Sequence, residues 1–217
     1  MSTSHPPQQL RSRRTEQRLI EATICLIQEG GLAACTVPAV AERAGVAVGS
    51  VYRRYADKQA MVSAAILALA AVPPEAAPQL VAIVDEASDL EDFFRRIALS
   101  TITTSQQNRT LILALREFGR TSTDELWLRE YHRLRGTART LILNAATERF
   151  GKDVPGGETA LRLALSAIYG AVEVVYTEPA PGLYDETPDA DAFAAGLAAM
   201  QVRGLMGCPP GRISTDG

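Results

Sequence analysis

The apolar residues of this chain recur three and four positions apart, and this spacing constrains the fold more than any other feature. In segment 158–176, Leu161, Leu165 and Ile168 mark one apolar helix face at this spacing. A second apolar face runs along the same segment, and a helix that is apolar on two sides has to be buried on two sides. No stretch of useful length alternates apolar and polar residues as a half-buried strand does. The sequence therefore predicts an all-helical fold.

Glycines and prolines divide the chain into a head of short helices and a body of longer ones. We expect a flexible basic arm over residues 1–13, a three-helix domain over 14–60, a larger helical bundle over 61–207 and a flexible tail over 208–217. Residues 75–87 fit either a loop or a frayed continuation of the preceding helix. The expected helices cover residues 15–29, 36–44, 48–55, 57–72, 88 onward, 108–118, 122–150, 158–176 and 189–206.

Charge is distributed unevenly between the two ends of the chain. The first 58 residues carry eight basic and five acidic side chains, and the remainder carries 14 basic and 20 acidic ones. A basic head on an acidic body attracts phosphate at one end and repels it at the other. Chance segregation of surface charge would give the same imbalance, so this feature alone decides nothing.

Composition argues against several other classes of protein. The opening stretch lacks the apolar core of a signal peptide, and the longest apolar run, residues 64–72, is too short to cross a bilayer. Three cysteines without C-x-x-C spacing suit a reduced, cytoplasmic protein. No G-x-S-x-G, H-E-x-x-H or phosphate-binding loop occurs, and Glu130 and His132 do not share a helix face. We therefore expect no catalytic residue, no metal site, no cofactor and no membrane partner.

The segment from Thr36 to Tyr55 has the spacing of a helix-turn-helix. Thr36 caps one short helix, Gly45 supplies a sharp turn, and a second short helix begins near Val48. This arrangement presents the second helix outward, toward the major groove of a duplex. Short helices joined by glycine also occur in ordinary bundles, so spacing alone is a moderate signal.

The outward residues of the second helix suit contacts with DNA. Gly49 has no side chain to hold its backbone away from a duplex. Ser50 and Tyr52 offer hydroxyls to phosphate oxygens. Arg53 and Arg54 offer guanidinium groups, which fit either a phosphate or the O6/N7 edge of guanine.

The run T-V-P-A-V-A-E-R-A-G-V-A-V-G-S-V-Y-R-R-Y-A-D-K-Q-A-M, residues 36–61, resembles the signature of the tetracycline-repressor (TetR) family. The resemblance covers about residues 14–66, and the rest of the chain resembles the family only in helix count, length and order. The matching positions are Thr36, Ala41, Ala44, Gly45, Val46, Gly49, Tyr52, Tyr55, Lys58 and Met61.

The resemblance implies roles for individual residues of the head. It implies phosphate contacts by Thr36, Ser50, Tyr52 and Lys58. It places Gly49 and Arg53 at the groove, Arg54 at a base edge or phosphate, and Tyr55 in the core. Val48 and Arg54 depart from the pattern, because a polar residue and a histidine are frequent there. The predicted DNA-binding residues are Thr36, Val48, Gly49, Ser50, Tyr52, Arg53, Arg54 and Lys58, and we expect Arg53 and Arg54 to set sequence preference at G·C pairs.

The body is expected to pair two chains and to sense a small molecule, as TetR-like proteins do. The predicted homodimer interface consists of residues 158–177 and 189–206, although both helices also suit the interior of a monomer. The expected function is a repressor that binds a palindromic DNA operator and is released by an unknown effector. An activator, or an architectural DNA-binding protein without an effector, would have the same head. Candidate effector-binding residues, for which plain core packing is the alternative, are Phe94, Phe118, Trp127, Tyr131 and Tyr169.

Overall fold

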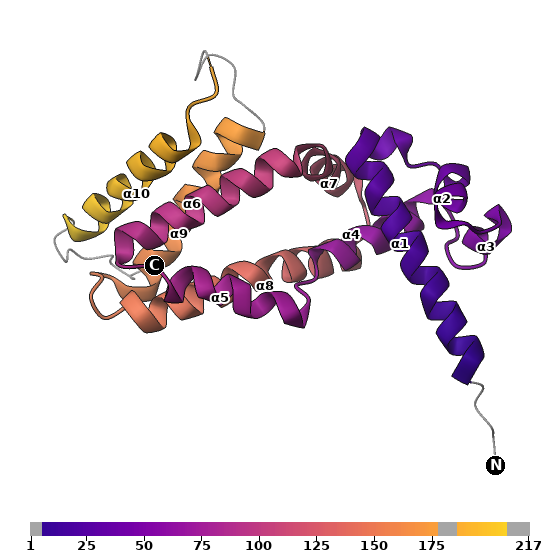
Figure 1. The fold of residues 1–217 in the computed structure, drawn as a ribbon, viewed down its shortest axis with the longest axis horizontal. Coiled ribbons are helices and arrows are strands. Elements are labelled where there is room, and N and C mark those ends of the chain that lie inside the picture. The colour runs from indigo at the N-terminus through magenta and orange to yellow at the C-terminus, as the bar shows by residue number, and fades with distance from the viewer. Residues whose placement is uncertain (1–5, 178–185, 208–217) are drawn as a thin grey trace. The chain divides into compact units, whose positions relative to one another are not determined.

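The computed structural model describes residues 6–177 and 186–207, and every regular element in these ranges is a helix (Figure 1). This confirms the all-helical fold predicted from the apolar spacing. The predicted tail, residues 208–217, lies outside the described residues. The chain divides into two compact units. We call them the head unit, which is the described part up to Ala71 together with Thr110–Arg135, and the body unit, which is Val72–Arg109 together with the described residues from Gly136 onward.

The first helix of the head unit, α1, is longer than the sequence predicts. It runs from Pro6 to Ala34, so the expected flexible arm is helical from residue 6 onward. Two prolines open α1, where a missing backbone N–H costs nothing. Thr15, where the predicted first helix begins, lies inside α1, and its hydroxyl donates to the carbonyl oxygen of Arg11 at 3.0 Å. Near its end α1 is kinked at Gly30 and Gly31, where the sequence predicts a stop.

Three further helices complete the helix-turn-helix region: α2 (Val37–Ala44), α3 (Val48–Tyr52) and α4 (Lys58–Ala70). The Thr36 hydroxyl caps α2 by accepting the N–H of Ala39 at 3.3 Å. Asp57 caps α4 in the same way, by accepting the N–H of Ala60 at 2.8 Å. Both caps lie where the sequence predicts helix starts.

Two later helices, α7 (Arg109–Thr121) and α8 (Glu125–Phe150), contribute to the head core. Met61, Val62 and Ile66 of α4 are buried in the same core. The structure therefore assigns α4 to the head unit, because α4 packs on α1, whereas the predicted boundary falls after residue 60. The contribution of α7 and α8 consists of Leu111, Ala114, Phe118, Trp127 and Tyr131.

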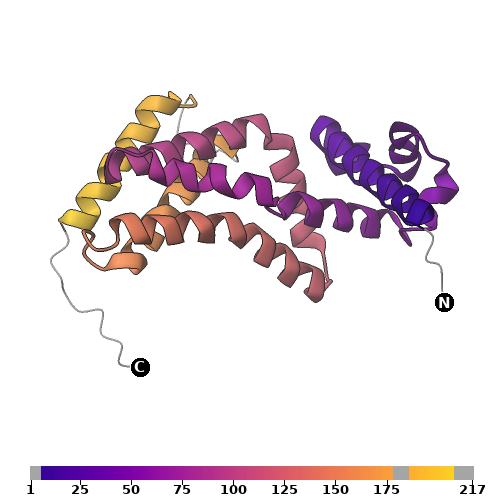
Figure 2. The same cartoon turned by 60° about the horizontal axis from the view of Figure 1, so that its bottom comes forward.

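The body unit is a bundle of helices around an apolar core. The sequence allowed either a loop or a helix over residues 75–87. The structure has the end of a 3₁₀ turn (Pro74–Ala76) and α5 (Ala77–Asp85) there. The helix α6 (Leu90–Gln107) packs against α9 (Gly157–Val172) and α10 (Ala190–Met206), as Figures 1 and 2 show. A π-helical turn, η2 (Glu173–Thr177), follows α9 and is absent from the sequence prediction.

Within the described residues, only one of the two apolar faces of α9 is buried. Leu161, Ile168 and Val172 are fully buried, whereas Leu163 on the second face is 63% exposed. By length and composition, Gly157–Thr177 is the one described helix that is suited to cross a membrane, and 39% of its apolar window is buried inside the protein. A core helix has the same composition, so this property is weak evidence for a membrane.

Candidate DNA-binding interface

The turn between α2 and α3 holds the second helix of the motif in place. Gly45 adopts the left-handed conformation (φ 64°), which favours glycine, and its N–H bonds back to the end of α2. The N–H of Val46 then donates to the carbonyl oxygen of Ala41 at 2.9 Å. Val51 anchors α3 on the head core, where it is 1% exposed. One face of α3 is thus fixed and the other is free to meet a partner.

The free face of α3 carries an aromatic and an aliphatic side chain in water. Tyr52 is 56% exposed and Val48 is 40% exposed. A Cβ atom built on Gly49, which lies between them, meets no atom of the protein within 4 Å. The fold itself therefore has no need of glycine at this position. A close approach by an external partner would explain why the side chain is absent.

The side chains of Ser50 and Arg53 lie together beside this face. Nη2 of Arg53 donates to Oγ of Ser50 at 2.7 Å. Both residues line a hollow of about 470 Å³, which Thr15 of α1 also lines. Arg53 is exposed, and a guanidinium group has five N–H donors, so it retains donors for a phosphate or a base edge.

Arg54, in contrast, forms hydrogen bonds within the protein. Its Nη2 donates to the carbonyl oxygen and the hydroxyl of Ser12, at 2.5 Å and 2.8 Å, and its Nη1 lies 3.9 Å from a carboxylate oxygen of Glu16. The sequence prediction places Arg54 at a base edge or phosphate, but here it ties the end of α3 to α1. This contact joins residues 42 positions apart, so no local pattern reveals it.

Thr36 and Lys58, which were predicted to contact phosphates, also have internal partners but retain donors. The Thr36 hydroxyl accepts a bond as the cap of α2, so its hydrogen remains available. Nζ of Lys58 donates to the carbonyl oxygen of Leu32 at 2.7 Å and has two further hydrogens. Both side chains are exposed.

Tyr55 lies in the head core, as the family resemblance implies. It is 9% exposed, and burial raises the pKa of its hydroxyl. The nearby Glu16 carboxylate raises this pKa further, and the charge of Arg54 opposes the shift.

The candidate effector-binding residues divide between the two units. In the head unit, Trp127 lies between Phe118 and Tyr131, with ring centroids 5.0 Å from each, and its Nε1 donates to the carbonyl oxygen of Ser63 at 3.2 Å. In the body unit, Phe94 is fully buried beside Phe93. The five residues therefore form no single cluster within either unit.

Tyr169, a candidate in the body unit, pairs with a charged side chain. The Arg139 guanidinium lies over its ring at 4.5 Å from the centroid. Burial raises the pKa of the Tyr169 hydroxyl, and Arg139 opposes the shift. Elsewhere in the described ranges, no group of three or more His, Cys, Asp or Glu side chains is placed to hold a metal ion.

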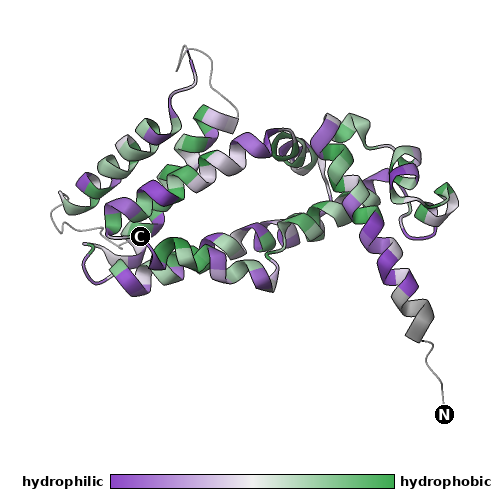
Figure 3. Ribbon diagram, in the orientation of Figure 1, coloured by the Kyte–Doolittle hydropathy of each residue, from purple (hydrophilic) through white to green (hydrophobic). Residues whose placement is uncertain are grey.

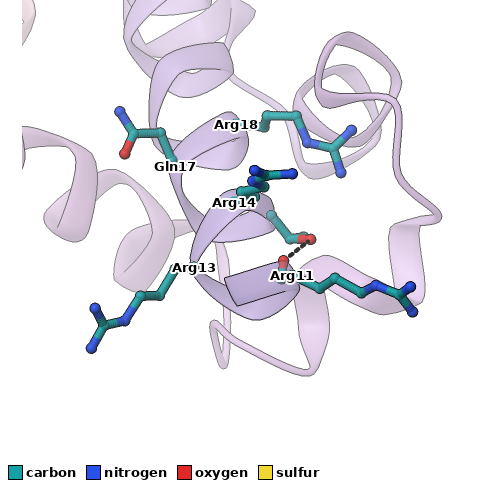
Figure 4. Close-up of a pocket in the computed structure, with 6 residues that line it drawn as sticks. Arg11, Arg13, Arg14, Gln17 and Arg18 are labelled. Carbon is teal, nitrogen blue, oxygen red and sulfur yellow. Dashed lines mark hydrogen bonds between the residues drawn. The ribbon is translucent and has the colours of Figure 1, made fainter. Parts of the chain in front are cut away.

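The first turns of α1 carry a set of arginines, of which the sequence prediction assigned Arg11 and Arg13 to a flexible arm. They line a hollow of about 750 Å³ together with Thr15 and Gln17. Figure 4 shows Arg11 and Arg18 pointing to the same side of α1 and Arg13 pointing away from them. The signal that was missed is the helical spacing of these arginines across residues 11–18.

A fixed, exposed α3 after a glycine turn, in an all-helical chain, defines a helix-turn-helix DNA-binding protein. Residues 19–65 match the family model of bacterial regulatory proteins, tetR family. This part of the chain is therefore a DNA-binding domain of the TetR type, which confirms the resemblance found in the sequence. The matched family model describes regulatory proteins. No curated protein matches the chain at a significant level.

Solved structures of transcriptional regulators share the fold over nearly the whole chain. The fatty acid degradation regulator FadR from Bacillus halodurans is 17% identical, with 94% of this chain and 98% of that chain covered and a TM-score of 0.59. FadR from Bacillus subtilis, solved in complex with stearoyl-CoA, is 15% identical, with 87% and 98% covered and a TM-score of 0.59. NalD, the secondary repressor of the MexAB-OprM multidrug efflux pump in Pseudomonas aeruginosa, is 20% identical, with 89% and 98% covered and a TM-score of 0.57.

Proposed function

We propose that this protein is a cytoplasmic transcriptional repressor that binds a palindromic operator as a homodimer and is released from DNA by a small molecule. The observation that carries the proposal is the exposed face of α3, where Tyr52 and Arg53 flank a backbone that Gly49 leaves uncovered. Hydroxyl and guanidinium groups on such a face suit phosphate and guanine contacts. The proposed function includes no enzymatic activity, no cofactor and no membrane partner.

The exposed apolar face of α9 supports the homodimer. Val174 at the end of this face is 39% exposed, and Met200 on α10 is 57% exposed. Both line a hollow of about 510 Å³ between the two helices, together with Gly170, Phe193 and Gly196. Small residues beside large apolar ones let helices of a second copy approach closely, and a two-fold pair of heads matches the symmetry of a palindrome.

A small-molecule effector is supported by the relative that was solved with stearoyl-CoA, whose fold this chain shares. The aromatic candidates in the body unit are Phe94 and Tyr169, and those in the head unit are Phe118, Trp127 and Tyr131. A ligand that favours the non-binding arrangement has to weaken DNA binding, and DNA has to weaken ligand binding by the same factor. Without such a ligand the same head suits an architectural protein, and the sign of regulation separates a repressor from an activator.

An unbiased selection from a library of random duplexes tests the proposal. The purified full chain is expected to enrich one sequence with two-fold symmetry, and Arg53→Ala is expected to enrich it less strongly. Arg129→Ala is the matched control, because Arg129 is an exposed arginine at the start of α8, remote in sequence from α3. If the full chain enriches no duplex, the proposal fails. If it enriches an asymmetric site, the palindrome and the paired heads fail while DNA recognition stands.

A further inference from the structure

We infer that Arg11, Arg14 and Arg18 of α1 form a second DNA-binding surface, which holds backbone phosphates beside the duplex segment that α3 contacts. The inference rests on the proposed function and extends it to a part of the chain before residue 19, where the family match begins. We call these three residues the arginine face of α1.

The arginine face is continuous because its residues lie three and four positions apart. At 1.5 Å per residue, Arg11 and Arg18 are roughly 10 Å apart along the helix axis. Figure 4 shows their side chains on the same side of α1, with Arg14 between them. Figure 3 shows this part of α1 as hydrophilic. An isolated arm would place the same charges at random, whereas the helix lines them up.

The arginine face has a fixed position relative to α3. Nη1 of Arg18 lies 3.9 Å from the position of a Cβ built on Gly45, in the turn of the motif. The hydrogen bonds from Arg54 to Ser12 join the end of α3 to the same part of α1. A duplex that is seated on α3 therefore meets α1 at a defined place.

The charges of the arginine face are not neutralised within the protein. None of its three residues forms an ion pair with a described residue, and all three are exposed. The two acidic residues nearest in sequence have other partners: Glu16 lies beside Arg54, and Glu21 accepts a bond from Gln17 at 3.0 Å. Neither carboxylate competes strongly with a phosphate for these guanidinium groups.

Backbone phosphate is the group that this surface fits. A guanidinium group stays charged at every physiological pH and offers paired N–H donors to phosphate oxygens. Duplex DNA carries a negative charge about every 1.7 Å along its axis, so a row of arginines about 10 Å long can meet several phosphates. The long side chains of the arginine face have no internal partner to orient them toward a particular base edge, so they contribute affinity rather than sequence preference.

The salt dependence of DNA binding tests this inference. The triple variant Arg11→Gln, Arg14→Gln, Arg18→Gln and the single variant Arg18→Gln are compared with Arg13→Gln. Arg13→Gln removes one charge from the side of α1 that points away from Arg11 and Arg18 (Figure 4). Affinity is measured by fluorescence anisotropy from 0.05 to 0.3 M salt, on the selected duplex and on a scrambled duplex of the same length.

We expect the slope of log affinity against log salt to fall by about 0.9 for each arginine that meets a phosphate. At 0.15 M salt this is a loss of roughly five-fold per contact, equal on both duplexes, so the ratio of the two affinities stays constant. Arg13→Gln should match the wild type. The helical circular dichroism signal should be unchanged in all variants, because these side chains form no ion pair with the described residues.

The outcomes separate this inference from the proposed function. If Arg53→Ala weakens binding while the triple variant keeps the affinity and slope of the wild type, the arginine face does not contact DNA and the proposed function stands. If Arg13→Gln and Arg18→Gln lower the salt slope equally, the arginines of α1 attract DNA only through their total charge, and the arginine face is not a defined contact surface. If the triple variant loses binding to anionic lipid vesicles but not to duplex, the partner is a membrane surface. If the wild type binds no duplex, both the function and the inference fail.

Discussion

The two adjacent arginines that follow α3 have different surroundings, and this difference assigns them different roles. Arg53 is exposed, with Ser50 as its neighbour, whereas Arg54 is bonded to Ser12. We predict that Arg53→Ala changes the base preference of the protein, because a bidentate contact with guanine discriminates by about 1–3 kcal/mol. We predict that Arg54→Ala weakens binding to all duplexes alike.

Binding of both variants to a set of single-base operator variants, together with urea denaturation, checks this prediction. Arg54→Ala should also lower the free energy of unfolding by about 1 kcal/mol, because it removes hydrogen bonds to a charged group that is partly exposed. A change of base preference on Arg54→Ala would contradict the role that its contact with Ser12 implies and would support the base contact predicted from the sequence.

Gly49 permits a prediction in which stability and affinity move in opposite directions. An alanine fits at this position, since its Cβ meets no atom within 4 Å. Gly49→Ala should raise the free energy of unfolding by about 0.5–1 kcal/mol, because alanine favours a helix over glycine. It should lower DNA affinity, because the methyl group stands where the duplex approaches.

Gly119→Ala in α7 is the matched control for Gly49→Ala, because its Cβ also meets no atom within 4 Å. It should raise stability in urea denaturation and leave binding to the selected duplex unchanged. If Gly49→Ala binds this duplex as tightly as the wild type, the backbone of α3 does not approach DNA closely.

At the residue level, the sequence predicted the caps and the turn but not the partners of the charged side chains. Thr36, Gly45 and Asp57 act on residues within four positions, so local rules suffice for them. The bonds from Arg54 to Ser12 and from Lys58 to Leu32 depend on how α1 packs, and an isolated motif contains no information on that packing.

Among the helices, the start of α6 gives a prediction for acid pH. Asp89 caps this helix by accepting the N–H of Asp92 at 2.8 Å, and the Asp92 carboxylate accepts the N–H of Ser88 at 3.1 Å. The helix predicted from the sequence begins at residue 88, one position before this cap. Hydrogen bonding to Arg96, and then to the Ser88 N–H, lowers the pKa of Asp92 from its usual 3.8 to about 2.

A carboxyl group with a lowered pKa in the folded protein stabilises the fold only while it is ionised. The contribution of Asp92 is therefore fully present above about pH 4 and is lost as pH falls through about 2. We predict that Asp92→Asn is less stable than the wild type at pH 5 and that the difference shrinks toward pH 2. Urea denaturation across this range measures it, with Glu91→Gln as the control from the same turn. A difference that stays constant with pH would contradict this assignment.

The helices that the sequence mispredicted share a physical cause. The first turns of α1 consist mostly of polar and charged residues, so the spacing of apolar residues does not predict a helix there. The π-helical turn η2 contains buried Val175, Tyr176 and Thr177, and the Tyr176 hydroxyl donates to the carbonyl oxygen of Pro188 at 2.9 Å. The π-helical turn thus coincides with packing inside the body unit. The spacing of apolar residues in the sequence gives no information on such packing.

For the whole molecule, the sequence located the two-sided helix but left open what covers its second face. The described residues leave Leu163 of α9 63% exposed, and isolated exposed leucines are ordinary on a protein surface. Leu163 is not isolated, since Val174 continues the same helix face and lines a hollow together with Met200 of α10. A second copy of the chain, with the same face, is the partner that the proposed function supplies.

We predict that Leu163→Glu converts the dimer to a monomer, because a charge in an apolar interface loses its hydration without a partner. Light scattering at micromolar concentration measures the mass. Leu126→Glu is the matched control, because Leu126 is 76% exposed at the start of α8 and undergoes the same chemical change. The control should keep the mass and DNA affinity of the wild type, while Leu163→Glu should lose cooperative binding to the palindrome and retain weak binding to a half-site. A dimeric Leu163→Glu variant would show that this face of α9 lies outside the interface. A monomeric wild type would contradict the dimer itself.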